Sequence, residues 1–342
     1  MTWWCVASKS PWEWAWTAYP GVWLTVLALA LPYIVSVRRR ARSGAGRVPR
    51  RTLAAFAGGV LVVWVASDWP IGTLGAGYLA CAHMLQYLLY AFIAAPLLLL
   101  GTPEWMARRI LGRLRLYRAV RFISVPLRAG VFFNVVLLAT HSPLAVDNLR
   151  TTQAGSFLMD VVWLLSGLVL WLPIVSPLPE LKPASYPVRM VYLFLAGGVM
   201  PMFPGGFLTF SGTPLYSLYE LAPRVGGFSA LGDQQLAGAI MKVGNIPIIW
   251  PVIYALFHHW YTEERRVSER ARTSPEAALD TGWVVTPGAT TGAGTPVPTT
   301  GLSSPSGPGP VVGARATGAT TGVSTGATAA PPGTPPGRTA PI

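Results

Sequence analysis

Long apolar stretches alternate with short polar connectors up to about residue 262 of this chain. An α-helix needs about 20 apolar residues to cross the hydrocarbon layer of a bilayer. Seven stretches approach that length: residues 20–37, 52–69, 75–100, 126–142, 155–173, 187–209 and 235–258. They are too long and too uniformly apolar for the strands of a barrel, and backbone amides in lipid must be paired within the segment. The pattern predicts an all-α, polytopic membrane protein built as a bundle of seven transmembrane helices.

Composition and charge agree with this class and give it an orientation. Hydrophobic residues make up 52% of the chain and charged residues only 11%. Much of the net charge of +13 sits in three segments that follow the first, third and seventh apolar stretches. The arginines there are Arg38, Arg39, Arg40, Arg42, Arg47, Arg50, Arg51, Arg108, Arg109, Arg113, Arg115, Arg118, Arg121, Arg265, Arg266, Arg270 and Arg272. The positive-inside rule therefore predicts an N-terminus outside and a C-terminus in the cytoplasm. A nucleic-acid partner would require a soluble surface on which basic and aromatic residues are interleaved. The sequence contains no such surface, so nucleic acid is not expected as a partner.

The rest of the chain divides into three parts by composition. Residues 1–19 are rich in tryptophan, lack a basic start typical of a cleavable signal peptide, and suit an outer interfacial segment. Residues 20–262 form the expected seven-helix domain, in which 105–122 has the pattern of an amphipathic helix on the inner leaflet. Residues 263–342 are expected to form a cytoplasmic basic segment followed by a disordered tail of Gly, Pro, Thr and Ala.

Unusual polar and sulfur-bearing side chains gather at the outer ends of five predicted helices. From the third to the seventh helix they are Cys81, His83, Met84, Gln86, Tyr87, His141, Met159, Asp160, Met200, Met202, Asp233, Gln234, Gln235, Met241 and Lys242. His83, Gln86 and Tyr87 share one helical face, because they are three and four positions apart. Polar groups inside a membrane are costly and mark sites. Their common depth predicts a functional site on the outer side.

Each of these residues also has a simpler structural explanation. A histidine at a helix boundary, such as His141, is typical of an interfacial cap, and methionines commonly fill gaps in helical cores. Asp233 precedes an apolar helix and has the chemistry of an N-cap. Lys242 could extend towards the interface or pair with Asp160. The coincidence of depth, and no single residue, favours a site.

The donor atoms at this depth indicate which ligand would bind. Imidazole together with thioether, with or without thiol, is a soft donor set that selects Cu(I) over hard cations. The two cysteines, Cys5 and Cys81, are both predicted outside and could form a disulfide or bind a soft metal. Copper is therefore the expected ligand.

Four runs of sequence resemble a known family. They are HMLQYLLYAFIAAPLLLLGTPEW, THSPLAVDN, RMVYLFLAGGVMPMFPGGFLTFSGTPLYSLYE and DQQLAGAIMKVGNIPIIW. Over about residues 20–262 the chain is similar to the CtaG family of bacterial integral membrane proteins, which assist cytochrome c oxidase assembly and are linked to copper. The resemblance implies a multi-pass protein of the bacterial plasma membrane whose partners are the lipid bilayer, oxidase subunits and copper.

The family motifs carry over only in part. The third-helix pattern His-Met-x-Gln-His is matched by His83, Met84 and Gln86, but Tyr87 replaces its second histidine. The fourth-helix histidine matches His141, and Asp160 stands where the fifth helix usually has a histidine. The seventh-helix motif is matched by Asp233, Gln234, Gln235 and Met241.

The resemblance with these departures implies a reduced ligand set. Copper would be held by His83 and His141 with sulfurs drawn from Met84, Met202, Met241 or Cys81. The supporting polar network would comprise Gln86, Tyr87, Asp160, Asp233, Gln234, Gln235 and Lys242. Alternatively, Tyr87 and Asp160 could form a polar network with Lys242 without a metal.

Several functions remain compatible with this pattern. The leading hypothesis is an assembly factor, not an enzyme, that binds or delivers Cu(I) on the outer side of the membrane. The alternatives are a copper transport or resistance protein and a metal-free scaffold for a respiratory complex. Two further classes are a redox protein with haem bound by His83 and His141, and a retinal-binding protein with retinal on Lys242. No hydrolase motif occurs in the sequence.

Overall fold

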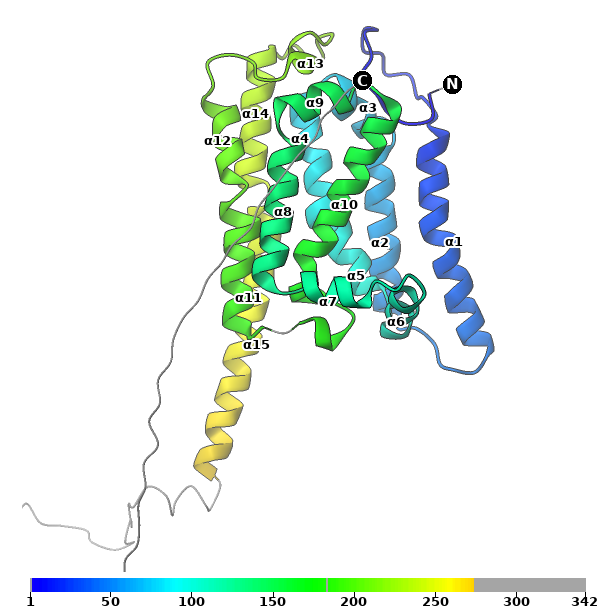
Figure 1. Cartoon of the computed structure of the whole chain (residues 1–342), viewed down its shortest axis with the longest axis vertical. Coiled ribbons are helices and arrows are strands. Elements are labelled where there is room, and N and C mark those ends of the chain that lie inside the picture. Colours follow the sequence, from blue (N-terminus) through cyan, green and yellow to red (C-terminus); the bar gives the residue numbers. More distant parts are fainter. Residues whose placement is uncertain (1, 183, 274–342) are drawn as a thin grey trace, which may run out of the picture. The chain divides into compact units, whose positions relative to one another are not determined.

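The computed structural model describes residues 2–182 and 184–273, which lie within one compact unit (Figure 1). Every regular element among these residues is a helix and none is a strand, which confirms the all-α class for this part of the chain. The expected tail from residue 274 onwards lies outside the described residues.

Six helical segments are long and apolar enough to cross a membrane within the described residues. They are α1 (Pro20–Arg42), α2 (Arg50–Ser67), α4–η1–α5 (Ala80–Leu88, Leu89–Ala94, Ala95–Gly101), α10 (Gln153–Val175), α11–η3–α12 (Tyr186–Tyr192, Leu193–Val199, Met202–Phe210) and α14–α15 (Ala230–Val243, Ile246–Thr273). The structure thus supports a multi-pass membrane protein.

The fourth predicted span differs from the others. Its helix α8 (Pro126–Thr140) has only 15 residues, and it meets α7 (Tyr117–Ile123) at a bend of 89°. Counted as one span, this bent pair brings the described total to seven, as predicted; otherwise the total is six. Proline at position 126 begins α8, where its missing amide proton costs no helical hydrogen bond.

The third predicted span is divided near its start. Residues 71–77 form a separate short helix, α3 (Ile71–Gly77), and the spanning helix begins only at Ala80. Gly75 lets α3 approach α4 closely, because a Cβ atom there would lie 2.0 Å from Gln86 Oε1. A continuous helix over 75–100 was therefore predicted wrongly at its beginning.

The sixth and seventh spans are both interrupted. A turn at Met200–Pro201 separates η3 from α12. The last span breaks at Gly244–Asn245 between α14 and α15. The Asn245 side chain donates a hydrogen bond of 2.6 Å to the carbonyl of Gly197, so the second break is tied to the preceding span.

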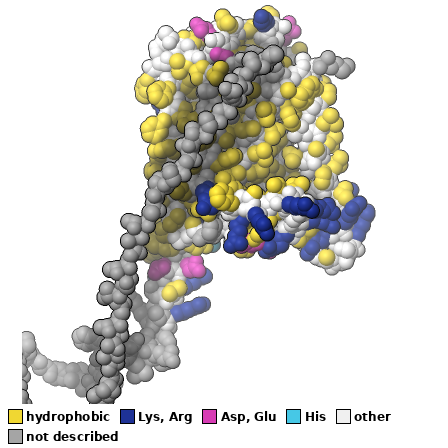
Figure 2. Space-filling model, viewed as in Figure 1, with side chains coloured by type: hydrophobic (Ala, Val, Ile, Leu, Met, Phe, Trp, Pro, Cys, Tyr) yellow, Lys and Arg dark blue, Asp and Glu magenta, His cyan; other side chains and the backbone are white. Residues whose placement is uncertain are grey.

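Arginine gathers at one end of the helical bundle. Figure 2 shows Lys and Arg side chains concentrated near α6 (Glu104–Arg113) and α7, the end called here the arginine-rich end. The amphipathic helix predicted over 105–122 is in fact these two helices, separated where Arg115 adopts φ 54°. The 3-10 turn η2 (Pro179–Leu181) packs against α7.

The short helices α3, α9 (Pro143–Leu149) and α13 (Ser217–Glu220) lie at the opposite end (Figure 1). The central spans are Ala80–Gly101 and Gln153–Val175, of whose apolar windows 61% and 56% are buried, against 11% for α1. Most candidate residues therefore stand on, or beside, the two helices that the rest of the bundle surrounds. Which end faces the cytoplasm stays a prediction.

Candidate functional site

His83 stands in the first turn of α4 and is fully buried. The carboxylate of Asp233, on α14, accepts hydrogen bonds from the backbone amides of Ala80 at 2.6 Å and Cys81 at 3.0 Å. These amides begin α4 and have no partner within the helix, and negative charge there also suits the helix dipole. Asp233 thus has the capping chemistry that its sequence indicates, but it caps α4, while Ser229 caps its own helix.

One hydroxyl group determines the tautomer of His83. The Tyr219 hydroxyl, on α13, donates to the carbonyl of Gly75 and lies 2.9 Å from His83 Nδ1. Because a hydroxyl has one proton, and the carbonyl takes it, the Tyr219 oxygen accepts from His83 Nδ1–H. In the neutral ring, the Nε2 atom of His83 is therefore a free electron-pair donor.

His141 is held in the same tautomer by a contact with its own helix. It is the C-cap residue of α8, and its Nδ1 atom lies 2.9 Å from the carbonyl of Leu137. A carbonyl oxygen can only accept, so Nδ1 carries the proton and Nε2 of the neutral ring has the lone pair. Among the described residues, neither His83 Nε2 nor His141 Nε2 has a hydrogen-bond partner, and both atoms are buried.

The two imidazole rings lie together within a shell of aromatic side chains. Their centroids are 5.6 Å apart, and the indole of Trp163, on α10, lies 4.8 Å from His83 and 5.5 Å from His141. Tyr87, one helical turn after His83, packs 4.7 Å from the His141 ring. Its hydroxyl is buried and has no hydrogen-bond partner in the described residues. Trp163 donates to the Thr140 hydroxyl at 3.0 Å, which holds the indole in place.

A buried ion pair borders this cluster. Arg150, between α9 and α10, is fully buried, with Nη2 3.0 Å from Asp160 Oδ1. The other oxygen of Asp160 accepts from the indole of Trp4 at 2.9 Å. The guanidinium of Arg150 also stands over the Trp163 ring, 4.9 Å from its centroid. Asp160 is therefore paired with Arg150 and not with Lys242, the partner considered from the sequence.

The remaining donors of the expected ligand set divide between the buried core and more exposed positions. Met84 and Met241 are fully buried in the main core, with Met159 in the same cluster. Met202 is 45% exposed on α12, so its thioether lies on the surface of the bundle. Cys81 is half-buried and free. Within the described part of the chain, no group of three or more His, Cys, Asp or Glu side chains could hold a metal ion.

The other residues of the expected polar network have separate structural contacts. Gln234 accepts from the Leu215 amide and donates to the Thr213 carbonyl at 3.2 Å, which fastens the loop after α12. Gln235 is exposed. Lys242 lies over the Phe210 ring, 4.7 Å from its centroid. Gln234 and Lys242 therefore support the fold around the last span.

Gln86 and Cys5 also bond to the backbone. Gln86 donates to the carbonyl of Ala66 at 2.8 Å and joins α4 to α2. The Cys5 thiol donates to the carbonyl of Ser67 at 3.2 Å, and burial raises its pKa to about 12. Both cysteines are free, so the disulfide considered from the sequence is not formed.

The sequence interpretation missed Arg150, Trp163, Tyr219 and Trp4. One signal was available for Arg150: it is the single arginine in a connector, 143–154, that is otherwise free of basic residues. A lone charge against the positive-inside pattern calls for a buried partner. Nothing in the spacing of the three aromatic residues distinguishes them from the many others in this chain.

The arrangement offers two imidazole nitrogens as donors in a buried, aromatic enclosure. Imidazole binds copper as well as zinc and iron, and hydrogen bonds to Nδ1 of a histidine both orient the ring and fix Nε2 as the donor. The absence of a nearby carboxylate set disfavours hard cations such as calcium. The donor set therefore fits a soft monovalent or borderline metal ion with few ligands.

Comparisons with known proteins agree with the resemblance noted in the sequence. A family model described as cytochrome c oxidase caa3 assembly factor (Caa3_CtaG) matches residues 30–263. Uncharacterized proteins of Mycobacterium bovis and Mycobacterium tuberculosis are each 25% identical to this chain in an alignment of 240 residues, and each match covers 60% of this chain. The chain covers 36% of the length of each relative. No solved structure gives a significant match.

Proposed function

The chain belongs to the Caa3_CtaG family of cytochrome c oxidase caa3 assembly factors, and on that premise we propose that it holds Cu(I) between His83 and His141 for the oxidase. The proposed role is that of a non-enzymatic factor of the bacterial plasma membrane. Copper is the cargo, and the two Nε2 atoms are its ligands. The proposed partners are the oxidase subunits that receive the ion.

One observation carries this proposal: both Nε2 atoms are buried and without a partner. Leaving one buried polar atom unpaired costs about 1–3 kcal/mol. A bound metal ion would offset that cost at both atoms at once. The Nδ1 contacts support the same conclusion, because they keep each ring in the tautomer that a metal ion requires.

The charge around the histidines is compatible with a monovalent cation. Arg150 alone would repel copper, but Asp160 lies 3.0 Å from it and neutralises the guanidinium. The pair as a whole adds no net charge next to the imidazoles. Any positive field that Arg150 still exerts opposes the single charge of Cu(I) less than it opposes a divalent ion.

The position of the site supports delivery on the outer side. His141 lies beside α9, at the end of the bundle opposite the arginine-rich end. The positive-inside rule assigns the arginine-rich end to the cytoplasm. On this proposal the histidines lie near the outer leaflet.

The proposal can be tested in cells that lack this chain. Such cells would express wild-type protein, His83→Ala, His141→Ala or His259→Ala at equal levels. His259 is the matched control, because it is an exposed histidine on α15. Oxidase activity and oxidase copper content should fall together in the first two variants and remain normal in His259→Ala. Normal values in His83→Ala would reject the copper site, and normal values without the chain would reject the assembly role.

A metal-free scaffold is the second candidate. It is favoured by the buried Arg150–Asp160 pair, which makes a polar network beside the histidines without any ion. On this candidate, purified wild-type protein carries no copper. His83→Gln, which keeps a hydrogen-bonding side chain, would then retain oxidase activity.

A further inference from the structure

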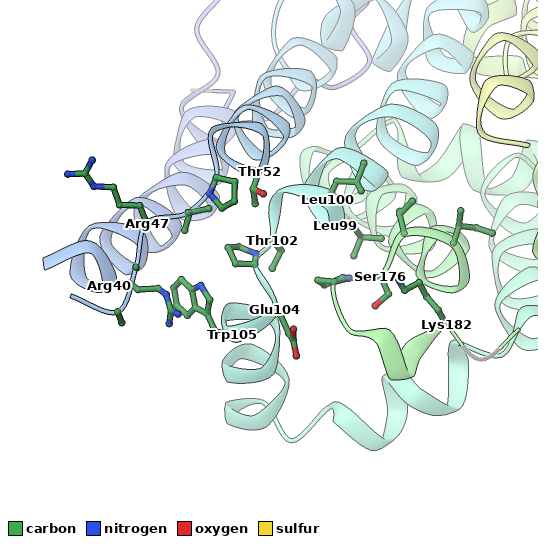
Figure 3. Close-up of a pocket in the computed structure, with 18 residues that line it drawn as sticks. Arg40, Arg47, Thr52, Leu99, Leu100, Thr102, Glu104, Trp105, Ser176 and Lys182 are labelled. Atoms are coloured by element: carbon green, nitrogen blue, oxygen red, sulfur yellow. The ribbon is translucent and has the colours of Figure 1, made fainter. Parts of the chain in front are cut away.

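A pocket of about 520 Å³ opens at the arginine-rich end, and Figure 3 shows the residues that line it. The histidines lie towards the opposite end of the bundle, near α9 (Figure 1). Its walls come from the end of α1, the connector to α2, the junction of α5 with α6, and the segment that follows α10. Figure 3 shows Arg40 and Trp105 on one side, with Ser176 and Lys182 on the other.

The pocket is lined by cations whose charge is not cancelled within it. Arg40, Arg47 and Lys182 line it, and no ion pair is formed by any of the three among the described residues. Glu104 is the one carboxylate in the described lining, and it is paired with Arg108 at 2.8 Å. The remaining field in the pocket therefore favours an anion.

Two further features favour an anion near the start of α2. This helix of 18 residues begins after Pro49, with no side-chain cap and no acidic residue in its first turn. Its first turn instead contains Arg50 and Arg51, so positive side chains stand at the positive end of the helix dipole. Arg40 is held by stacking on Trp105, with its guanidinium 4.9 Å from the ring centroid. This contact orders the guanidinium without neutralising it.

Part of the pocket lining is apolar. Leu99, Leu100, Ile174 and Val175 line it, and Leu100 is 52% exposed. A pocket lined by both cations and apolar side chains is complementary to the two parts of an anionic phospholipid, its charged headgroup and its acyl chains. Basic pockets between helices at the cytoplasmic interface suit anionic headgroups.

We propose that this pocket binds the phosphate of an anionic phospholipid, with its acyl chains along the Leu99–Leu100 side. Arg40, Arg47 and Lys182 would contact the headgroup. The lipid would join α1, which is largely unburied, to the central α4–α5 span. This inference concerns a different site from the histidine pair and does not depend on copper.

The test uses native mass spectrometry of the full-length protein in detergent. Phosphatidylglycerol, phosphatidylcholine with the same acyl chains, and inorganic phosphate are titrated separately. Wild-type protein should prefer phosphatidylglycerol to phosphatidylcholine by about tenfold, which corresponds to ~1.4 kcal/mol. The double variant Arg40→Gln/Lys182→Gln should lose this preference. Arg47→Gln lies in an exposed connector, where folding is not at risk, and should weaken it in part.

The control removes the same charge from the same end but outside the pocket. Arg113→Gln/Arg121→Gln changes two exposed arginines of α6 and α7 that do not line it. This control should keep the wild-type preference. If the control lost the preference for phosphatidylglycerol equally, general surface charge would explain the preference, and the proposed lipid site would be rejected. Equal binding of both lipids by the wild type would also overturn it, and displacement of the lipid by millimolar inorganic phosphate would assign the pocket to free phosphate instead.

Discussion

Tyr219→Phe tests how the site keeps His83 ready for a metal ion. The substitution removes one oxygen atom and leaves the ring in place. Two contacts are lost with that oxygen: the bond to the Gly75 carbonyl and the 2.9 Å contact to His83 Nδ1. The imidazole can then rotate or move its proton to Nε2, where it would block metal binding.

The expected loss of Cu(I) affinity follows from the role of the Tyr219 hydroxyl in orienting His83. Removing a hydrogen-bond partner that orients a metal-binding histidine typically lowers affinity by about 10–100-fold. This range corresponds to ~1.4–2.7 kcal/mol at 25 °C. We expect Tyr219→Phe to weaken Cu(I) binding within this range and to leave the stoichiometry unchanged.

Tyr216→Phe is the matched control. Tyr216 is as buried as Tyr219, and its hydroxyl donates at 2.8 Å to the backbone carbonyl of His141. Removing it costs a similar buried hydrogen bond but touches neither imidazole nitrogen. Cu(I) affinity would be measured anaerobically by competition with a chromophoric chelator. Wild-type affinity in Tyr219→Phe, or an equal loss in Tyr216→Phe, would refute the argument from the tautomer.

Three further predictions concern stability and orientation. Asp160→Asn leaves Arg150 buried without its counter-charge and should destabilise the protein by about 3–5 kcal/mol, seen as a lower melting temperature; an unchanged melt would contradict the buried pair. Gly167→Ala places a Cβ 2.6 Å from the Cα of Ala91 and should cost about 1–3 kcal/mol, whereas Gly206→Ala meets nothing within 4 Å and should cost nothing in the same assay. Reporter fusions in the α1–α2 and α6–α7 connectors should be active only as cytoplasmic reporters, and the reverse result would invert the proposed topology.

The spans were predictable because lipid imposes a simple requirement on length and polarity. That requirement says little about where a helix bends. It did not separate α3 from α4, where Gly75 allows close contact with Gln86. The stretch 126–142 was already the shortest of the seven, and α8 is too short to count alone as a span. These breaks are decided by packing between helices, which the pattern of one segment does not contain.

The candidate site was predictable in its histidines and not in their surroundings. His83 and His141 stood out because polar residues shared a depth, and their rings do lie together. The partner of Asp160 was missed, because Arg150 reaches it from a connector and the sequence offered Lys242 as a competitor. Asp233 had recognisable cap chemistry, but the helix that it caps begins at Ala80, 153 positions earlier in the chain. Residue type thus indicated chemistry, while the choice of partner depended on the fold.

The central claim is that two buried imidazoles hold one Cu(I). Its most direct test is copper quantification on purified wild-type protein and on the variants His83→Ala, His141→Ala and His259→Ala after loading with Cu(I) and desalting. We predict about one copper per chain in the wild type and in His259→Ala, and almost none in the other two variants, because each loses one of only two proposed ligands. Equal copper content in all four proteins would contradict the claim.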